Sequence, residues 1–295
     1  MARPTLRQLD YLLALEHQKS FSKAAIYCNV TQSTLSAGIK ELETILEHQL
    51  VNRTTRQITL TAFGHDVVSK AKIILNDVDH IVSSAQQIKS PLCGTVRLGI
   101  IPTIAPYFLP NILPHIQKSF PDLEIELYED LSERLIEQLH KRQIDAAIIA
   151  FPYQTEELET HELLEENFYL AAPKDKPLPQ NSDIQDLDPE NLLLLEDGHC
   201  LRDHALSACK LSSPIQRKKF SATSLATLIQ MVNSGYGVTL LPEMVIKNST
   251  MPSNITIQDL KSPAPMRKIG IIWPKKSPHI RDLNAFLNAL RDFLA

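Results

Sequence analysis

The residues around Cys200 are of types that favour thiol chemistry. Cys200 follows a turn at Gly198-His199 and begins a segment that contains no Gly or Pro as far as Cys209. We expect this segment to be a helix, with Leu201 on its apolar stripe and with His199 and Arg202 beside Cys200. A helix N-terminus and neighbouring cationic groups both favour the thiolate. Cys200 is therefore a candidate reactive cysteine of low pKa.

Cys209 is the second cysteine of this stretch. If the residues from Cys200 to Cys209 form one helix, the two Cα atoms are roughly 13 Å apart. A disulfide needs Cα atoms within about 7 Å, so the two sulfurs can bond only if the helix unwinds. Such a pair would be a redox switch. The alternative is that both are small buried apolar residues, and the spacing alone favours this alternative.

The region after residue 94 must position these cysteines, and there strands and helices alternate. An apolar run at 192–195 has the length of a buried strand. Further strands are expected at 95–101, 123–128, 144–150, 169–171, 238–241 and 266–273, and helices at 102–120, 132–142, 224–233 and 280–294. This order predicts an α/β fold with mainly parallel sheets, in two lobes around a cleft. Loops or crossings between lobes are expected at 152–160, 174–183 and 261–265.

The first 60 residues predict three helices, at 6–18, 21–27 and 31–46, with Ser20 and Thr31 as N-caps of the last two. A tight turn between the last two helices is typical of a helix-turn-helix. The polar face of the third helix can reach base edges and phosphates through Gln32, Ser33, Thr34, Ser36 and Lys40. A hairpin at 50–60 with Arg53 and Arg56 suits a wing. The alternative is a three-helix bundle with a solvated polar face.

A heptad seam follows the hairpin. Its members are Val67, Ala71, Ile74, Val78, Ile81, Ala85 and Ile88. A single helix has no partner for this seam within a small bundle, so we expect a dimerisation helix. The alternative is core packing within one chain.

The composition describes a globular protein of two or three domains: 295 residues, 43% hydrophobic and 22% charged. The net charge of −4 means that nucleic-acid binding requires a local basic patch. We see neither a signal peptide nor a membrane-spanning run, so we expect a cytoplasmic protein whose four cysteines are free thiols. We take Cys28 and Cys93 as structural, and we expect neither a metal nor a cofactor.

Several motifs resemble those of a known family. The first 89 residues are similar to the winged helix-turn-helix and linker helix of LysR-type transcriptional regulators. The matching residues are Phe21-Ser22-Lys23-Ala24-Ala25, the run 31–36, Ile39, Leu42, Glu43, Arg53, Thr61, Ala62 and Gly64. The later motifs resemble the hydrogen-peroxide-sensing branch of that family, at 99–103, Pro106-Tyr107, 196–203, Cys209 and 222–225.

This resemblance implies three parts. Residues 1–61 would be a winged helix-turn-helix DNA-binding domain, and 62–90 a linker and dimerisation helix. Residues 91–295 would be a redox-sensing, two-lobed α/β regulatory domain resembling periplasmic binding proteins. Lobe I would comprise about 94–165 and 267–295, and lobe II about 166–266. The implied partners are double-stranded promoter DNA, RNA polymerase and further copies in a homotetramer, a dimer of dimers.

The resemblance also implies a chemistry. Hydrogen peroxide would oxidise Cys200 to a sulfenic acid, which Cys209 would capture as a disulfide. The peroxide pocket would contain Thr103, Ser132, His199, Arg202 and Asp203. Three positions depart from the pattern: Ser33 replaces a common Pro, Ser132 a common Thr, and Lys219 a His. The departures at Ser132 and Lys219 put the tuning of peroxide reactivity in doubt.

Three functions follow from these observations. The first is a peroxide-responsive activator of oxidative-stress defence genes. The second is a LysR-type regulator that answers to a small organic inducer in the cleft, and the third is a thiol peroxidase, which leaves the helix-turn-helix unused. Structural roles stay open for three residues: His199 as a capping or loop residue, Arg202 as a surface ion-pair partner of Asp203, and Thr103 as a helix cap.

Overall fold

The computed structural model describes residues 2–53, 58–87, 92, 94–175, 187, 191–202, 222–262 and 264–295. It divides into two compact units, Met1–Ile88 and Lys89–Ala295, which we describe separately. Within the described ranges, no helix combines the length and the apolar character that crossing a bilayer requires.

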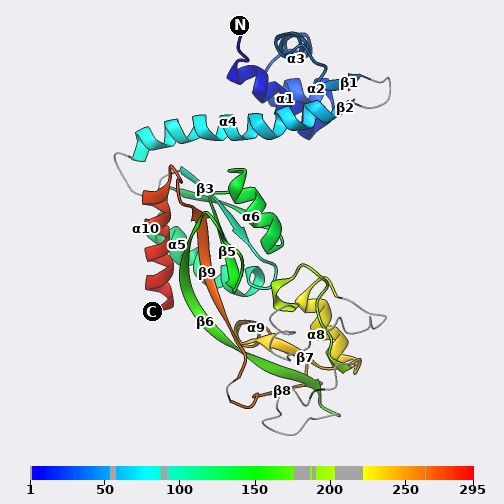
Figure 1. The fold of residues 1–295 in the computed structure, drawn as a ribbon, viewed down its shortest axis with the longest axis vertical. Helices are drawn as coiled ribbons and strands as arrows, with labels where there is room; N and C mark the ends of the chain where they lie inside the picture. Colours follow the sequence, from blue (N-terminus) through cyan, green and yellow to red (C-terminus); the bar gives the residue numbers. More distant parts are fainter. Residues whose placement is uncertain are drawn as a thin grey trace. The chain divides into compact units, whose positions relative to one another are not determined.

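The first unit begins with the three predicted helices, α1 (Leu6–Gln18), α2 (Phe21–Tyr27) and α3 (Gln32–Leu46) (Figure 1). Their N-caps are those that the sequence indicates. The side chain of Ser20 accepts a hydrogen bond from the backbone N–H of Lys23, and that of Thr31 accepts one from Thr34. These caps satisfy donors that the helix itself leaves without partners, which fixes where α2 and α3 begin.

The predicted wing is an antiparallel hairpin of β1 (Val51–Arg53) and β2 (Ile58–Leu60), followed by α4 (Ala62–Gln87). Gly64 lets α4 start directly against the hairpin, because a Cβ at this position would lie 2.2 Å from the carbonyl oxygen of Leu50. Glu43 of α3 also accepts hydrogen bonds from the backbone N–H groups of Leu50 and Val51. The wing is therefore tied to both α3 and α4.

The heptad seam of α4 has two parts with different environments. Val67 and Ala71 are buried in the core of the first unit, so at these positions the alternative of packing within one chain is correct. Further along the helix, Ile74 is 44% exposed and Ile81 is 70% exposed. The apolar surface that a second copy could cover is thus limited to the later part of the seam.

The second unit contains a seven-stranded sheet, in the order β4-β3-β5-β9-β6-β7, with β8 also paired to β6. The strands are β3 (Gly94–Ile100), β4 (Leu123–Glu129), β5 (Ala146–Phe151), β6 (Leu158–Pro173), β7 (Thr239–Pro242), β8 (Ile255–Gln258) and β9 (Met266–Pro274). Only β4-β3 and β3-β5 are parallel pairs among these strands, and the other pairs are antiparallel. The prediction of mainly parallel sheets is therefore wrong, because β9 lies between β5 and β6 and runs against the direction of both.

Two long strands, β6 and β9, connect the two halves of the second unit (Figure 1). The first part of β6 pairs with β9 along Leu158–Asn167, and its last part pairs with β7 and β8. The predicted loop at 152–160 is thus wrong at its end, where β6 has already begun. Two elements were not predicted from the sequence, β8 and the short helix α9 (Glu243–Asn248).

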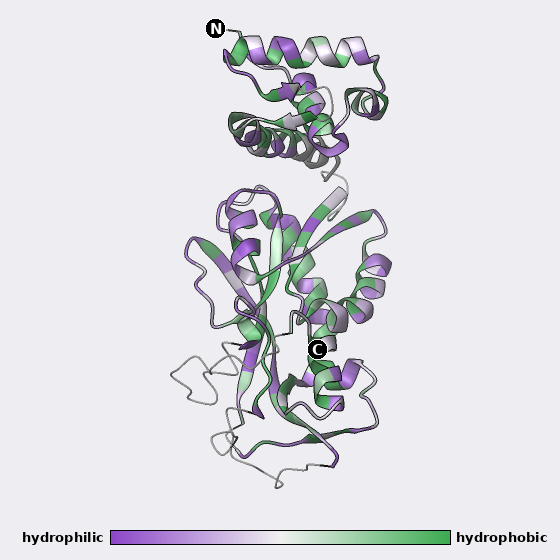
Figure 2. Ribbon diagram, turned by 90° about the vertical axis from the view of Figure 1, so that its right-hand side faces the viewer, coloured by the Kyte–Doolittle hydropathy of each residue, from purple (hydrophilic) through white to green (hydrophobic). Residues whose placement is uncertain are grey.

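The remaining helices are amphipathic and pack against this sheet. They are α5 (Ala105–Ser119), α6 (Ser132–His140), α8 (Leu225–Asn233) and α10 (Ile280–Leu294). Figure 2 shows helices striped with hydrophobic and hydrophilic residues beside more uniformly hydrophobic central strands. The residues of β5 from Ala146 to Ala150 are fully buried, which explains their continuous apolar run.

Candidate functional site

The apolar run 192–195 leads into the candidate site. It forms isolated parallel bridges, from Leu192 to Val238 and from Leu195 to Ala222, rather than a regular strand. Backbone hydrogen bonds from Leu193 to Val238 and from Glu196 to Ala222 hold it in place. Leu192, Leu193 and Leu195 are buried as predicted and Leu194 is half-buried. The run fixes the position from which the chain turns toward Cys200.

Cys200 lies directly after a glycine-dependent turn. Gly198 has φ +94°, a conformation that L-residues rarely adopt, and Cys200 to Arg202 are helical. The thiol-bearing residue is buried, with 4% of its surface exposed. The predicted placement of Cys200 in the first turn of a helix is confirmed for the described residues.

Arg202 makes its described contacts with the turn that precedes Cys200. Its Nε lies 3.0 Å from Oδ1 of Asp197, and its Nη1 donates to the carbonyl oxygen of Leu195. The guanidinium therefore holds the turn in place, and its charge is balanced by the exposed carboxylate of Asp197. Its ion-pair partner among the described residues is Asp197. The pairing with Asp203 lies outside the described residues and stays a prediction.

His199 is buried beside Cys200, with 8% of its surface exposed. Burial lowers the pKa of His199 below its usual value of 6.5, and the nearby Glu196 only partly opposes this effect. The imidazole is therefore neutral at pH 7, and a neutral ring cannot stabilise a thiolate by charge. The lowered pKa does not favour the cationic contribution expected of His199, and the ring nitrogens remain able to form hydrogen bonds.

Thr103 and Ser132 lie at the same edge of the sheet. Thr103 comes three residues after the end of β3, and Ser132 three residues after the end of β4. These two strands are parallel, with Ile100 opposite Glu129, so their carboxyl ends coincide. Both side chains are buried, with 2% exposure each. This edge is where ligands bind in open α/β sheets.

The cysteine turn reaches the same edge from the other half of the unit. A Cβ on Gly198 would lie 3.0 Å from Cδ1 of Leu131, the residue before α6 and Ser132. The turn that carries His199 and Cys200 is thus packed against the start of α6. The fold thus brings together Leu131 and Gly198, which are 67 positions apart in the sequence.

Arg267 of β9 is a buried residue that the sequence analysis missed. Its Nη1 donates to Oγ1 of Thr103 at 3.2 Å, and its Nη2 donates to the carbonyl oxygen of Thr103 at 3.3 Å. Its Nε donates to Oε1 of Glu166 at 2.7 Å, across the β6–β9 pair. One signal could have indicated it: Arg267 and Lys268 lie at the start of a strand whose later residues are apolar, and a charged residue is rarely buried without a partner.

Three of the residues singled out in the sequence, Asp203, Cys209 and Lys219, lie outside the described residues. Of the two other cysteines, Cys93 also lies outside them. Cys28 is half-buried in the first unit, and burial, together with the charge of Asp10, raises the pKa of its thiol. A raised pKa suits the structural role expected for Cys28.

The candidate nucleic-acid interface is the start of α3. Gln32, Ser33, Thr34 and Lys40 are exposed and Ser36 is half-buried. The hydroxyl of Ser22 on α2 donates to Oε1 of Gln32 at 2.8 Å, so the two helices share a polar contact at this surface. Arg53 ends β1, although the position of its side chain lies outside the described part, as does Arg56.

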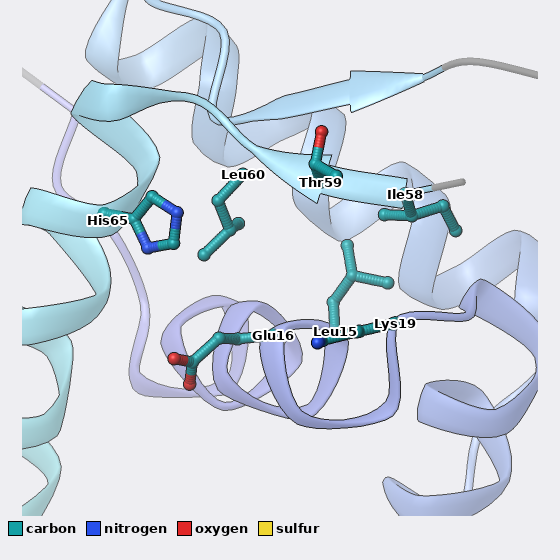
Figure 3. Close-up of a pocket in the computed structure, with 7 residues that line it drawn as sticks. All are labelled: Leu15, Glu16, Lys19, Ile58, Thr59, Leu60 and His65. Atoms are coloured by element: carbon teal, nitrogen blue, oxygen red, sulfur yellow. The ribbon is translucent and has the colours of Figure 1, made fainter.

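A pocket of about 530 Å³ lies in the first unit between α1, β2 and the start of α4 (Figure 3). Glu16 and Lys19 line one side of it, and His65 lines another. Among the described residues, none of those predicted to contact DNA or peroxide lines this pocket, and we assign it no part in the candidate site.

Comparison with known families gives two matches that together cover nearly the entire chain. Residues 6–65 match the bacterial regulatory helix-turn-helix protein model of the LysR family. Residues 89–295 match the LysR substrate binding domain model.

Curated relatives match along most of their length. The chain is 38% identical to the HTH-type transcriptional regulator EstR of Acinetobacter baylyi, over 100% of this chain and 98% of the relative. It is 36% identical to the DNA-binding transcriptional dual regulator OxyR of Escherichia coli, over 92% of this chain and 90% of the relative.

Solved structures of OxyR proteins are also similar to this chain along nearly its full length. A full-length OxyR variant from Pseudomonas aeruginosa is 32% identical, with a TM-score of 0.77 over 99% of this chain and 96% of that one. A hydrogen-peroxide-bound OxyR variant from Corynebacterium glutamicum is 31% identical, with a TM-score of 0.66 over 99% of this chain and 94% of that one.

Proposed function

The chain belongs to the LysR family of DNA-binding transcriptional regulators, and from this premise we propose that it responds to hydrogen peroxide through Cys200. The observation that carries the proposal is the position of Cys200. This residue is buried and starts a helix, directly after a turn that packs against the edge of the sheet where Thr103 and Ser132 lie. The similarity to OxyR proteins along nearly the full chain supports the same reading.

The proposed reaction begins with the Cys200 thiolate. It attacks one oxygen of hydrogen peroxide, the O–O bond breaks, and the sulfur becomes a sulfenic acid while hydroxide leaves and is protonated to water. The developing negative charge on the leaving oxygen needs hydrogen-bond donors. The Thr103 hydroxyl can donate, because Arg267 occupies one of its acceptor positions and leaves its O–H available. Ser132 and His199 are the further polar groups of this pocket.

The second step is the proposed switch. The Cys209 thiol attacks the sulfenic sulfur, a disulfide forms and a second water is released. Since a continuous helix would hold the two sulfurs apart, the disulfide favours a rearranged segment. We propose that this rearrangement alters a homotetramer on promoter DNA and its contact with RNA polymerase, and so activates oxidative-stress defence genes.

DNA recognition in this proposal rests on α3 and the wing. Gln32, Ser33, Thr34, Ser36 and Lys40 would contact bases and phosphates, and Arg53 and Arg56 would contact the flanking backbone. Basic groups at these positions supply the local patch that a chain of net charge −4 requires.

Thiol titration of the full-length reduced protein tests the proposal. One equivalent of peroxide should consume two of the four thiols in the native chain, one in Cys209→Ser and none in Cys200→Ser. Cys28→Ser is the matched control, since it should lose two of its three remaining thiols. If native protein and Cys200→Ser lose thiols equally, the peroxide proposal fails, and a small organic inducer in the cleft becomes the better reading. Continuous peroxide turnover with a thiol reductant would instead indicate a thiol peroxidase.

A further inference from the structure

The strongest feature that the proposed reaction does not use is a buried carboxylate, Glu166. Only 4% of its surface is exposed, and it lies on β6 directly opposite Arg267 on β9. Its Oε1 accepts from Nε of Arg267 at 2.7 Å. Both side chains of this ion pair are almost completely buried, unlike the other carboxylates of β6 that form ion pairs, Glu159, Glu162 and Glu165.

The second oxygen of Glu166 is also occupied. Oε2 accepts from the backbone N–H of Met244 at 2.7 Å, at the start of α9. The carboxylate is therefore held from two sides, by a strand and by a helix. A buried carboxylate with both oxygens engaged is a rigid group, because any rotation would break one charge-assisted hydrogen bond.

This rigidity is transmitted to Thr103 through the guanidinium. The guanidinium is planar, so fixing Nε on Glu166 also fixes the directions of Nη1 and Nη2. These two nitrogens donate to the hydroxyl and the carbonyl oxygen of Thr103. An unbroken line of contacts thus runs from α9 through Glu166 and Arg267 to the loop between β3 and α5.

The burial of the pair strengthens its contacts. Glu166 lines a pocket of about 300 Å³ that has both apolar residues, such as Phe108 and Met244, and charged ones, such as Glu243 and Lys247. The side chains of Arg267 and Glu166 are themselves almost completely buried, so the guanidinium without its carboxylate would be strongly disfavoured. Glu166 therefore supplies both the direction and the charge balance of Arg267.

We infer that Glu166 is a positioning residue of the cysteine pocket, which acts through Arg267 to orient the Thr103 hydroxyl toward the leaving oxygen of peroxide. This inference rests on the proposed function. Glu166 does not touch the reacting atoms, so its effect depends entirely on Arg267 and Thr103.

The inference is tested with Glu166→Gln, which keeps the shape of the side chain and removes its charge. Two rates are measured on the full-length reduced protein: thiol oxidation by peroxide and alkylation of Cys200 by iodoacetamide. Alkylation does not require donors for a leaving oxygen of peroxide. We expect the peroxide rate to fall about tenfold or more, because small misplacements of a reacting group have effects of this size. The alkylation rate should stay within about twofold or rise.

Glu162→Gln is the matched control, because Glu162 lies on the same strand and pairs with Lys268 at the surface. It should leave both rates unchanged. Glu166→Asp keeps the charge, and it gives a second variant if Glu166→Gln does not fold. Its shorter side chain should still lower the peroxide rate selectively.

A double variant separates positioning from a general structural role. If Glu166 acts through Arg267, the variants Arg267→Gln and Glu166→Gln/Arg267→Gln should react with peroxide at rates within about twofold of each other. Additive losses, or a fall in both the peroxide and the alkylation rates, would overturn the inference. A Glu166→Gln protein as fast as native would overturn it while the proposed function stands. A native protein that does not react with peroxide would overturn the proposed function itself.

Discussion

Thr103 is held by a residue of the sheet, Arg267, and it is also the proposed hydrogen-bond donor to peroxide. Its hydroxyl accepts a hydrogen bond from Arg267, and its backbone carbonyl accepts another. A hydroxyl has one donor and two acceptor positions, so this arrangement directs the O–H away from the guanidinium. The residue is buried, and its orientation is therefore a property of the fold rather than of solvent.

Replacing Thr103 with Val should lower the peroxide rate of Cys200 by about 10²-fold, the typical effect of removing one donor to a developing anion. Thr103→Ser keeps the hydroxyl and should stay within a few-fold of native. The rates are measured as thiol loss under excess peroxide. A Val variant that reacts as fast as the Ser variant would remove Thr103 from the pocket chemistry.

His199 makes a separate prediction about pH. Its pKa in the folded protein is lowered by burial, below the value of 6.5 usual for an unfolded chain. As the pH falls below about 6.5, the unfolded chain binds a proton that the folded protein does not yet bind. The contribution of His199 to stability is therefore present above this pH, and it is lost as the pH falls toward the folded pKa.

Urea unfolding at pH 7.5 and pH 5.5 measures this effect, with Trp273, the only tryptophan, as the fluorescent reporter of the second unit. The loss of stability on acidification should be smaller in His199→Asn than in the native chain. His140→Gln, at the exposed end of α6, is the control and should behave as native. An unchanged acid loss in His199→Asn would contradict the assignment of a buried neutral ring.

At the scale of elements, the turn before Cys200 can be compared with a second glycine turn in the same unit. Gly198 and Gly235 both have positive φ, +94° and +78°. A Cβ at Gly198 would press on Leu131, whereas a Cβ at Gly235 would meet nothing within 4 Å. Substitution of either glycine would strain the backbone, but only substitution of Gly198 would also displace the turn. Comparing the two variants therefore separates these two effects.

Alanine at either glycine should cost about 1 kcal/mol of stability, because the side chain opposes positive φ. Only Gly198→Ala should also change the peroxide rate, since it moves the His199-Cys200 turn relative to α6. Unfolding followed by Trp273 fluorescence gives the first quantity, and thiol loss gives the second. Equal peroxide rates in the two variants would show that the contact with Leu131 has no part in placing the thiol.

At the scale of the whole molecule, the later part of the α4 seam is the surface on which we expect a second copy to pack. Ile74 and Ile81 are exposed in a single chain, while Val67 and Ala71 are already used by its core. Exposed isoleucines at heptad spacing are typical of a helix that pairs with a second copy. DNA-binding proteins of this kind reach two half-sites as dimers.

Ile81→Glu should therefore shift the protein toward a smaller assembly and weaken DNA binding, because a charge would have to be buried between the two helices. Light scattering gives the mass, and titration of promoter DNA at fixed salt gives the affinity. Ile26→Glu on α2 is the control: Ile26 is 75% exposed but does not belong to the seam, so the mass should not change. If Ile81→Glu has the mass and affinity of native protein, the seam is not the dimer contact.

Patterns of neighbouring residues were sufficient to predict several helices and strands. The caps at Ser20 and Thr31, the heptad spacing and the apolar strands correctly predicted α2, α3, α4, β5 and α10. The turn at Gly198 and the helical start at Cys200 were also predicted. In each case the interactions that determine the element join residues a few positions apart, so the sequence alone shows them.

The rest depends on contacts between residues far apart in the chain. The antiparallel pairing of β6 with β9, the burial that lowers the pKa of His199 and the contact of the Gly198 turn with Leu131 depend on tertiary packing. The line from Glu166 through Arg267 to Thr103 joins residues up to 164 positions apart. A charged residue reveals its type in a sequence but not its partner, because the energy of a buried charge depends on what the fold places beside it.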